Sequence, residues 1–204
     1  MRKIEKRSIF CLILAALLGL GLAFFCFQFV VDGGDWASYP YNRHLYNNAG
    51  QLKGGTILDR DGDMLSTLDE DGNRIYNDDA TVRRATLHAV GDKNGNIGAG
   101  ALTSFADKLS GYNLLTGVYS PLGTGNSLYL TIDAYLNNVA YQALNGMNGT
   151  VGVYNYKTGE ILCMVSTPTF DPANPPDIAA DDPAWDGVYV NRLLSANSIP
   201  GSIF

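Results

Sequence analysis

Residues 149–171 read GTVGVYNYKTGEILCMVSTPTFD. Two apolar runs, 150–154 and 161–165, flank the polar stretch 155–160, which contains a glycine. Short runs rich in β-branched residues on either side of such a stretch are typical of a β-hairpin. The apolar density of both runs predicts that the hairpin belongs to a core sheet.

A strand and a helix are predicted immediately before this hairpin. Residues 128–132 (LYLTI) have the composition of a strand. Thr131 or Asp133 can cap a helix that follows, and Gly146 stands at the usual stop position. Apolar residues recur in the next stretch at the spacing of one buried helix face, namely at Leu136, Val139, Ala140, Ala143 and Leu144.

Two short apolar runs nearer the amino terminus, 56–58 and 64–68, are each followed by an Asp-Gly turn. Because Asp-Gly supplies the positive φ that tight turns need, we expect a small antiparallel β unit here. Helical spacing of apolar residues predicts one short helix over 101–109. Five prolines in residues 167–183 predict an irregular surface loop.

The run 9–31 has 23 residues and no charge. At about 1.5 Å per residue it spans roughly 34 Å, enough for a hydrocarbon core of about 30 Å. It is longer than the apolar region of a cleavable signal peptide and too long, with charged flanks, for a buried core helix. We therefore expect an uncleaved anchor. Bases precede it and acids follow, which predicts residues 1–8 in the cytoplasm and 32–204 outside, with 32–55 as a linker.

Composition excludes several classes of protein. The net charge is −6, and residues 1–31 carry +3, which leaves −9 for the rest. An acidic body argues against nucleic-acid binding. Three cysteines, of which only Cys163 lies outside the apolar run, are too few for a disulfide scaffold.

No cofactor or metal site is predicted. His44 and His88 lack the spacing of a zinc site, and we interpret both as surface or packing residues. Asp59, Asp61, Asp63 and Glu70 imitate a calcium loop, but Met64 stands where that loop needs glycine. Ordinary Asp-rich turns are the preferred interpretation.

The carboxyl-terminal residues 200–204 read PGSIF. Ser202 follows a Pro-Gly break, where a helix could begin, and a serine nucleophile can be activated by a lysine three residues later, as in S-x-x-K. That fourth position follows Phe204. By pattern alone, Ser202 could equally be a helix cap.

Four separated segments resemble the class B penicillin-binding proteins, the monofunctional D,D-transpeptidases that cross-link peptidoglycan. Residues 55–62 (GTILDRDG) resemble the family's R-G-x-I-x-D-R-x-G motif, although Gly54 stands in place of its arginine. Residues 130–133 (LTID) with 142–144 (QAL), the hairpin through 172, and 191–204 resemble later family segments in the right order. Ile203 and Ser198 replace the usual Thr and Tyr.

The resemblance implies an α+β fold: a transmembrane helix (9–31), a linker and β-rich non-catalytic pedestal (32–126), and the start of a transpeptidase domain (127–204) whose antiparallel sheet is flanked by helices. It implies that Ser202 is the acyl-accepting nucleophile and that Asp59 and Arg60 are structural. The implied partners are stem peptides ending in D-Ala-D-Ala, β-lactams, the bacterial cell membrane and other cell-wall synthesis proteins. Since the motif lysine and the later S-x-N and K-[ST]-G segments would follow Phe204, we expect an amino-terminal fragment that does not acylate by itself.

Two other functions remain open at this level. A membrane-anchored penicillin-recognising sensor or β-lactamase shares S-x-x-K, but is not expected to carry the Asp-Arg motif beside the anchor. A non-enzymatic scaffold could bind cell-wall assembly proteins through its acidic ectodomain. That scaffold would leave the hairpin core half-built, with exposed sheet edges.

Overall fold

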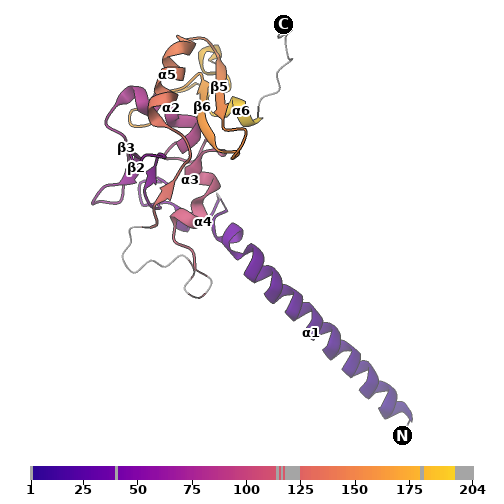
Figure 1. Cartoon of the computed structure of the whole chain (residues 1–204). Coiled ribbons are helices and arrows are strands. Elements are labelled where there is room, and N and C mark those ends of the chain that lie inside the picture. The colour runs from indigo at the N-terminus through magenta and orange to yellow at the C-terminus, as the bar shows by residue number, and fades with distance from the viewer. Residues whose placement is uncertain are drawn as a thin grey trace.

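The computed structural model describes residues 2–39, 41–113, 115, 117, 125–179 and 182–195. A long helix, α1 (Arg2–Ala37), projects as a stem from a domain that contains the other elements (Figure 1). Within the described residues, Lys6–Ala37 is the one stretch that is long and apolar enough to cross a membrane, judged by length and composition. The predicted combination of an α+β domain with a single amino-terminal apolar helix is confirmed.

Helix α1 extends further than the sequence predicts. The prediction treated 32–55 as a linker, but α1 continues through Asp32 to Ala37, and a short 3-10 helix, η1 (Arg43–Leu45), follows. The side-chain amide of Asn42 donates to the carbonyl oxygens of Trp36 (2.7 Å) and Ala37 (3.2 Å) and so satisfies two terminal carbonyl groups of the helix. The linker prediction is wrong for this part of the segment.

The first sheet contains β1 (Ile57–Leu58), β2 (Met64–Leu68), β3 (Arg74–Tyr76) and β4 (Leu128–Tyr129) in the order β3-β2-β1-β4. Strands β1 and β2 are antiparallel neighbours, as predicted, and β3, which was not predicted, pairs antiparallel with β2. Strand β4 is parallel to β1 and is shorter than the predicted strand 128–132. The predicted division after residue 126 stays a prediction, although this sheet contains strands from both sides of it.

Gly55 precedes β1 where two segments of backbone meet. A Cβ atom added at this position would overlap the carbonyl group of Asn126. The Gly55 amide donates to Leu109 O at 3.0 Å, and the Asn126 amide donates to the same oxygen at 3.1 Å. The glycine is therefore required by close approach of the backbone.

Helix α2 (Ala80–Val90) was not predicted as a helix. It is capped by Asp79, whose carboxylate accepts from the Thr81 amide at 2.7 Å. The predicted helix 101–109 is interrupted at Phe105, giving α3 (Ala101–Ser104) and α4 (Ala106–Leu109).

Helix α5 (Ala134–Leu144) is capped by Asp133, one of the two predicted capping residues. The predicted buried face is partly wrong, because Val139 is 46% exposed whereas Asn137 is fully buried. Asn137 explains the difference: its Oδ1 accepts from the Met164 amide at 3.1 Å, and its Nδ2 donates to Asp133 O at 2.7 Å. A satisfied polar side chain thus lies where α5 contacts the backbone at Met164.

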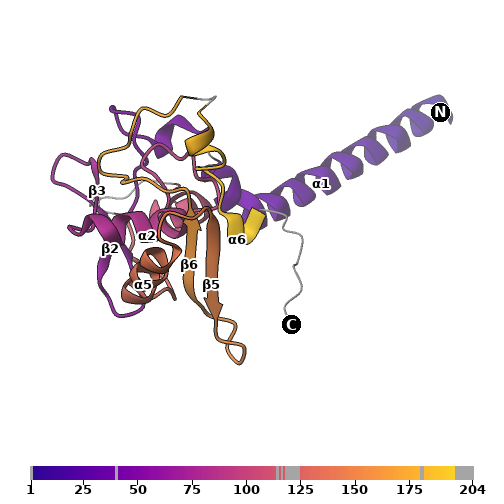
Figure 2. The same cartoon turned by 90° about the horizontal axis from the view of Figure 1, so that it is seen from above.

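The predicted hairpin is confirmed as the antiparallel pair β5 (Gly149–Tyr154) and β6 (Ile161–Thr167). Helices α2 and α5 pack against β6, which is buried from Cys163 to Thr167, whereas β5 is largely exposed (Figure 2). The core-sheet prediction therefore holds for β6 only. The described residues of the proline-rich segment that follows, 168–179 and 182, form no strand or helix before η2 (Pro183–Trp185). The last described helix is α6 (Arg192–Ser195).

One apolar cluster joins the two sheets. It contains Ile57 and Leu65 from the first sheet, Met164 from β6, and Ile132 and Ala134 from the connection between them. The two sheets consequently share one core.

Candidate functional site

Ser202, the predicted nucleophile, lies outside the described residues. The described chain leads toward it through α6, which ends at Ser195. The site can therefore be built from the residues that hold α6 in place.

Asn191 fixes the start of α6 to the core. It is 1% exposed, and its Nδ2 donates to His88 O at 3.2 Å and lies 3.3 Å from Met164 Sδ. Its Oδ1 accepts from the Leu193 amide at 3.2 Å, within the first turn of α6. One buried side chain therefore links α2, β6 and α6.

Arg192 ties the same helix to the end of β6. Its amide donates to Ser166 Oγ at 3.1 Å, and its Nε donates to Thr167 O at 2.9 Å. Its Nη2 donates to Asp186 O at 2.8 Å. Asn191 and Arg192, which the sequence identified only through a family resemblance, are both positioning residues in this structure.

Helix α6 lies close to β5 as well as β6. A Cβ atom added at Gly152 would lie 2.6 Å from Leu193 Cδ1. A glycine in β5 therefore makes room for the leucine of α6.

His88 is a packing residue, in agreement with the sequence interpretation. It is 1% exposed, and its Nε2 donates to Val188 O at 2.8 Å. Burial, with a smaller contribution from the nearby Arg192 guanidinium, lowers the pKa of His88. His44, the other histidine, is exposed within η1.

A bidentate ion pair connects α2 with the loop after β6. Arg83 Nε lies 2.7 Å from Asp171 Oδ1, and Arg83 Nη2 lies 2.6 Å from Asp171 Oδ2. Arg83 Nη1 also donates to the carbonyl oxygens of Asn77 and Asp78. The hydrogen bonds from Arg83 hold the pKa of Asp171 below its usual range.

Asp59 uses its carboxylate for backbone hydrogen bonds. Its Oδ1 accepts from the Asp61 and Asp63 amides, each at 2.9 Å, and its Oδ2 accepts from the Ala134 amide at 3.1 Å. Both oxygens thus serve the turn and the start of α5, which supports the turn interpretation over the calcium loop. Within the described residues, no group of three or more His, Cys, Asp or Glu side chains is placed to hold a metal ion.

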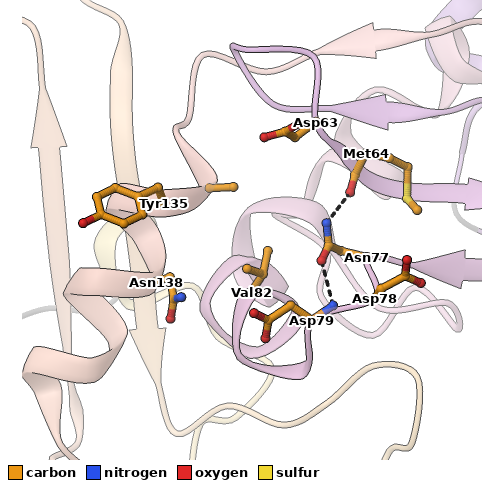
Figure 3. A pocket seen from close by; sticks show the side chains of 9 residues that line it. Asp63, Met64, Asn77, Asp78, Asp79, Val82, Tyr135 and Asn138 are labelled. Carbon is orange, nitrogen blue, oxygen red and sulfur yellow. Dashed lines mark hydrogen bonds between the residues drawn. The ribbon is translucent and has the colours of Figure 1, made fainter.

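A cleft of about 590 Å³ opens between the β1–β2 turn, the start of α2 and α5 (Figure 3). Asn77 lies on its wall, donates to Met64 O at 2.8 Å, and accepts from the Asp79 amide at 2.9 Å. Asp79 in turn caps α2, so these polar groups are already engaged in local structure. The cleft does not include any residue of α6.

A second pocket, of about 510 Å³, is mainly apolar and does reach α6. Leu194 contributes to its wall together with Met164 of β6 and Leu128 of β4. It lies between the first sheet and the helix that leads toward Ser202.

Comparison with known families finds a similarity in this region. Residues 149–204 match the family described as the penicillin binding protein transpeptidase domain. The match covers 56 of the 204 residues. The match begins at β5 and includes β6, Asn191, Arg192 and α6, and the predicted resemblance to class B penicillin-binding proteins is confirmed.

Two curated relatives and one solved structure are also similar to this chain. The peptidoglycan D,D-transpeptidase MrdA of Acinetobacter baumannii is 48% identical over 84 residues, covering 38% of this chain and 12% of that protein. MrdA of Haemophilus influenzae is 41% identical over 51 residues, covering 25% and 8%. The chain therefore spans only about a tenth of the length of these relatives. The crystal structure of PBPA from Mycobacterium tuberculosis has a similar fold, with a TM-score of 0.52 at 20% identity, covering 69% of this chain and 36% of that one.

Two residues that hold structural elements together, Asn137 and Arg83, were not predicted from the sequence. Asn137 lies on a helix whose apolar spacing drew attention to other positions, and Arg83 lies 88 residues from its partner Asp171. The position of Asn137 could have indicated its burial. It lies one helical turn before Tyr141 and next to Leu136 and Ala140, and these three residues are on the buried side of the helix. No local pattern in the sequence indicates the Arg83–Asp171 pair.

Proposed function

We propose that this chain is the amino-terminal part of a membrane-anchored, penicillin-binding D,D-transpeptidase that cross-links peptidoglycan stem peptides. The observation that carries the proposal is the match of residues 149–204 to the transpeptidase domain, a segment in which β6 is buried against α2 and α5. The two curated relatives named above are both peptidoglycan D,D-transpeptidases.

Ser202 is the proposed nucleophile. Its hydroxyl oxygen attacks the carbonyl carbon of the penultimate D-Ala, the peptide bond to the terminal D-Ala breaks, and the hydroxyl proton passes to the departing amine. An amine of a neighbouring stem peptide then attacks the ester, which forms the cross-link and returns the proton to Ser202. A β-lactam ring would acylate the same oxygen. The anchoring of α6 by Asn191 and Arg192 supports this role, because it fixes the last described helix before Ser202 in the sequence.

Labelling with a fluorescent penicillin tests the nucleophile. Membranes carrying the native protein are expected to show a labelled band that Ser202→Ala abolishes. Ser198→Ala, in the same segment, serves as the matched control and is expected to keep the band. Persistent labelling of Ser202→Ala would remove Ser202 from this role.

The motif lysine provides a separate test. The proposal places lysine after Phe204 in the encoded protein, and any other residue there would remove the S-x-x-K arrangement. A polypeptide that ends at Phe204 lacks this lysine and is expected to remain unlabelled by penicillin. Labelling of that polypeptide would contradict the lysine-dependent mechanism.

The proposed topology places residues 1–8 in the cytoplasm, 9–31 in the membrane, and 32–204 outside, with the division after residue 126 separating pedestal from transpeptidase segment. The basic flank before the apolar run and the acidic residues after it support this orientation. In spheroplasts, external protease is expected to digest the domain and leave the amino-terminal tail protected. Digestion of a tag at residue 1 by the external protease would contradict the proposed topology.

A further inference from the structure

The domain begins directly at the end of α1. Gly33 is buried, and a Cβ atom added there would lie 2.6 Å from the Tyr112 hydroxyl oxygen. The next glycine, Gly34, faces Asp107 of α4. A Cβ atom added at Gly34 would lie 3.9 Å from the Cβ of Asp107. Because two consecutive helix glycines allow this close approach, the end of α1 and α4 pack together without a spacer.

Exposed aromatic side chains surround this junction. Trp36, Tyr39 and Tyr41 are 45%, 57% and 85% exposed. The Trp36 ring turns back along α1 toward Phe25, with ring centroids 6.4 Å apart, and the rings of Tyr39 and Tyr41 lie 5.7 Å apart. We call these three residues the aromatic collar. Its tryptophan is thus in contact with the apolar run itself.

The charge of the segment around the collar differs from that of the rest of the domain. Residues 36–54 contain Arg43 and Lys53, both exposed, and no Asp or Glu, whereas Asp32 and Asp35 directly precede the collar. Residues 32–204 as a whole are strongly acidic. Aromatic rings with nearby bases match the headgroup layer of an anionic membrane, where Trp and Tyr are enriched and basic side chains are attracted.

The length of α1 sets the depth of the collar. Trp36 follows Val31 by about 7.5 Å along the helix, at about 1.5 Å per residue, and the headgroup layer extends roughly 5–7 Å beyond the hydrocarbon on each side. Since the Trp36 ring turns back toward Phe25, it reaches the inner part of that layer. With Val31 at the edge of the hydrocarbon, the Trp36 ring therefore lies at the depth of the lipid interface, and Tyr39 and Tyr41 follow it directly in the sequence.

We propose that the aromatic collar, together with Arg43 and Lys53, is a lipid-binding surface that seats the domain on the outer headgroup layer of an anionic membrane. The proposal rests on the anchoring of α1 in the membrane, which is part of the proposed function. This surface would lie within the segment 32–55 that the sequence predicts as a linker.

Tryptophan quenching measures this directly, because the chain contains only Trp36 and Trp185. The 204-residue chain is reconstituted in vesicles of phosphatidylglycerol and phosphatidylethanolamine with lipids brominated near the headgroup or near the chain end. In Trp185→Phe, the remaining Trp36 is expected to emit at shorter wavelength and to be quenched more by shallow than by deep bromines. In Trp36→Phe, the remaining Trp185, which packs beside Phe170 and Val188, is expected to be unquenched.

A matched tyrosine pair extends the test to the rest of the collar. In a chain lacking both tryptophans, Tyr41→Trp is compared with Tyr156→Trp, since Tyr41 and Tyr156 are similarly exposed at 85% and 80%. Tyr156 lies in the β5–β6 turn, which points away from α1 (Figure 2). Shallow quenching of the tryptophan at position 41 but not at 156 supports the proposal. Equal quenching, or none at 41, overturns it.

A comparison of two lipids tests the contribution of Arg43 and Lys53. Quenching at position 41 is expected to be stronger in vesicles of phosphatidylglycerol than in vesicles of phosphatidylcholine. The difference should disappear in Arg43→Gln/Lys53→Gln, and its persistence there would remove these bases from the surface. Resistance of the chain to carbonate extraction is measured in parallel: release from the membrane overturns the anchor, whereas retention without quenching overturns the collar alone.

Discussion

The Asp59 carboxylate accepts a hydrogen bond from the backbone amide of Ala134, 75 residues later, at 3.1 Å. The Arg60 amide donates to Ile132 O at 3.0 Å and strengthens the same connection. The Asp-Arg motif beside the anchor and the segment that opens α5 are therefore joined through the backbone. This contact gives a structural reason for an aspartate at position 59, which is only 2% exposed.

Replacing Asp59 tests that connection. Asp59→Ala leaves three backbone N–H groups without their acceptor and is expected to lower the free energy of unfolding by about 2–3 kcal/mol. Asp61→Ala, at an exposed position in the same turn, should change it by less than about 0.5 kcal/mol. Urea unfolding in detergent micelles measures both. Hydrogen exchange at the Ala134 amide should rise in Asp59→Ala only, and an unchanged exchange rate there would contradict the assignment.

The Arg83–Asp171 pair predicts a second change in stability. Asp171→Asn removes a charged acceptor from a bidentate pair and is expected to cost about 1.5–3 kcal/mol. Asp177→Asn, exposed in the same loop, is the control and should have little effect. Because the pKa of Asp171 is lowered in the folded state, the contribution of the pair is complete above the unfolded pKa of about 3.9 and is lost as the pH falls through the folded value. Acid unfolding that is identical in wild type and Asp171→Asn would exclude this contribution.

His88 predicts a pH dependence in a higher range. Its folded pKa is lowered, so the unfolded state binds the proton more readily once the pH falls below about 6.5. Stability should therefore be fully present above that pH and decline below it, by at most about 1.4 kcal/mol per pH unit. His88→Gln can still donate to Val188 O and should remove this part of the decline. His44→Gln, at an exposed histidine, should retain the wild-type profile.

Cys163 predicts a protected thiol. Burial, with a smaller contribution from Asp133, raises its pKa to about 11, and the thiolate is the reactive form. In a Cys11→Ser/Cys26→Ser background, iodoacetamide should modify Cys163 only after the domain unfolds. Tyr156→Cys in a chain with Cys163→Ser, on the exposed β5–β6 turn, should react without unfolding. Rapid modification of native Cys163 would show that β6 opens locally.

Local patterns predicted the parts of the fold whose partners are close in sequence. The β5–β6 hairpin and the Asp133 cap depend on neighbouring residues, and both are confirmed. Helix α2 was missed because its buried positions include Thr86 and His88, which are not apolar. The parallel pairing of β4 with β1 could not be predicted, since it depends on contacts with distant segments.

The contacts of the candidate site could not be predicted from local sequence patterns either. The resemblance identified Asn191 and Arg192 from a short motif, but their hydrogen bonds to His88, Ser166 and Thr167 depend on tertiary packing. Ser202 as the nucleophile stays a prediction, because it lies outside the described residues.

The parallel pairing of β1 with β4 also determines an order of assembly. As the chain emerges from its amino terminus, β2 and β3 can pair at once, whereas one edge of β1 waits for Leu128 and Tyr129. Closing so long a loop is slow, and an unpaired strand edge is a template for aggregation. Nascent chains that stall before residue 128 should therefore depend on chaperones, whereas chains that have passed residue 129 can complete the first sheet.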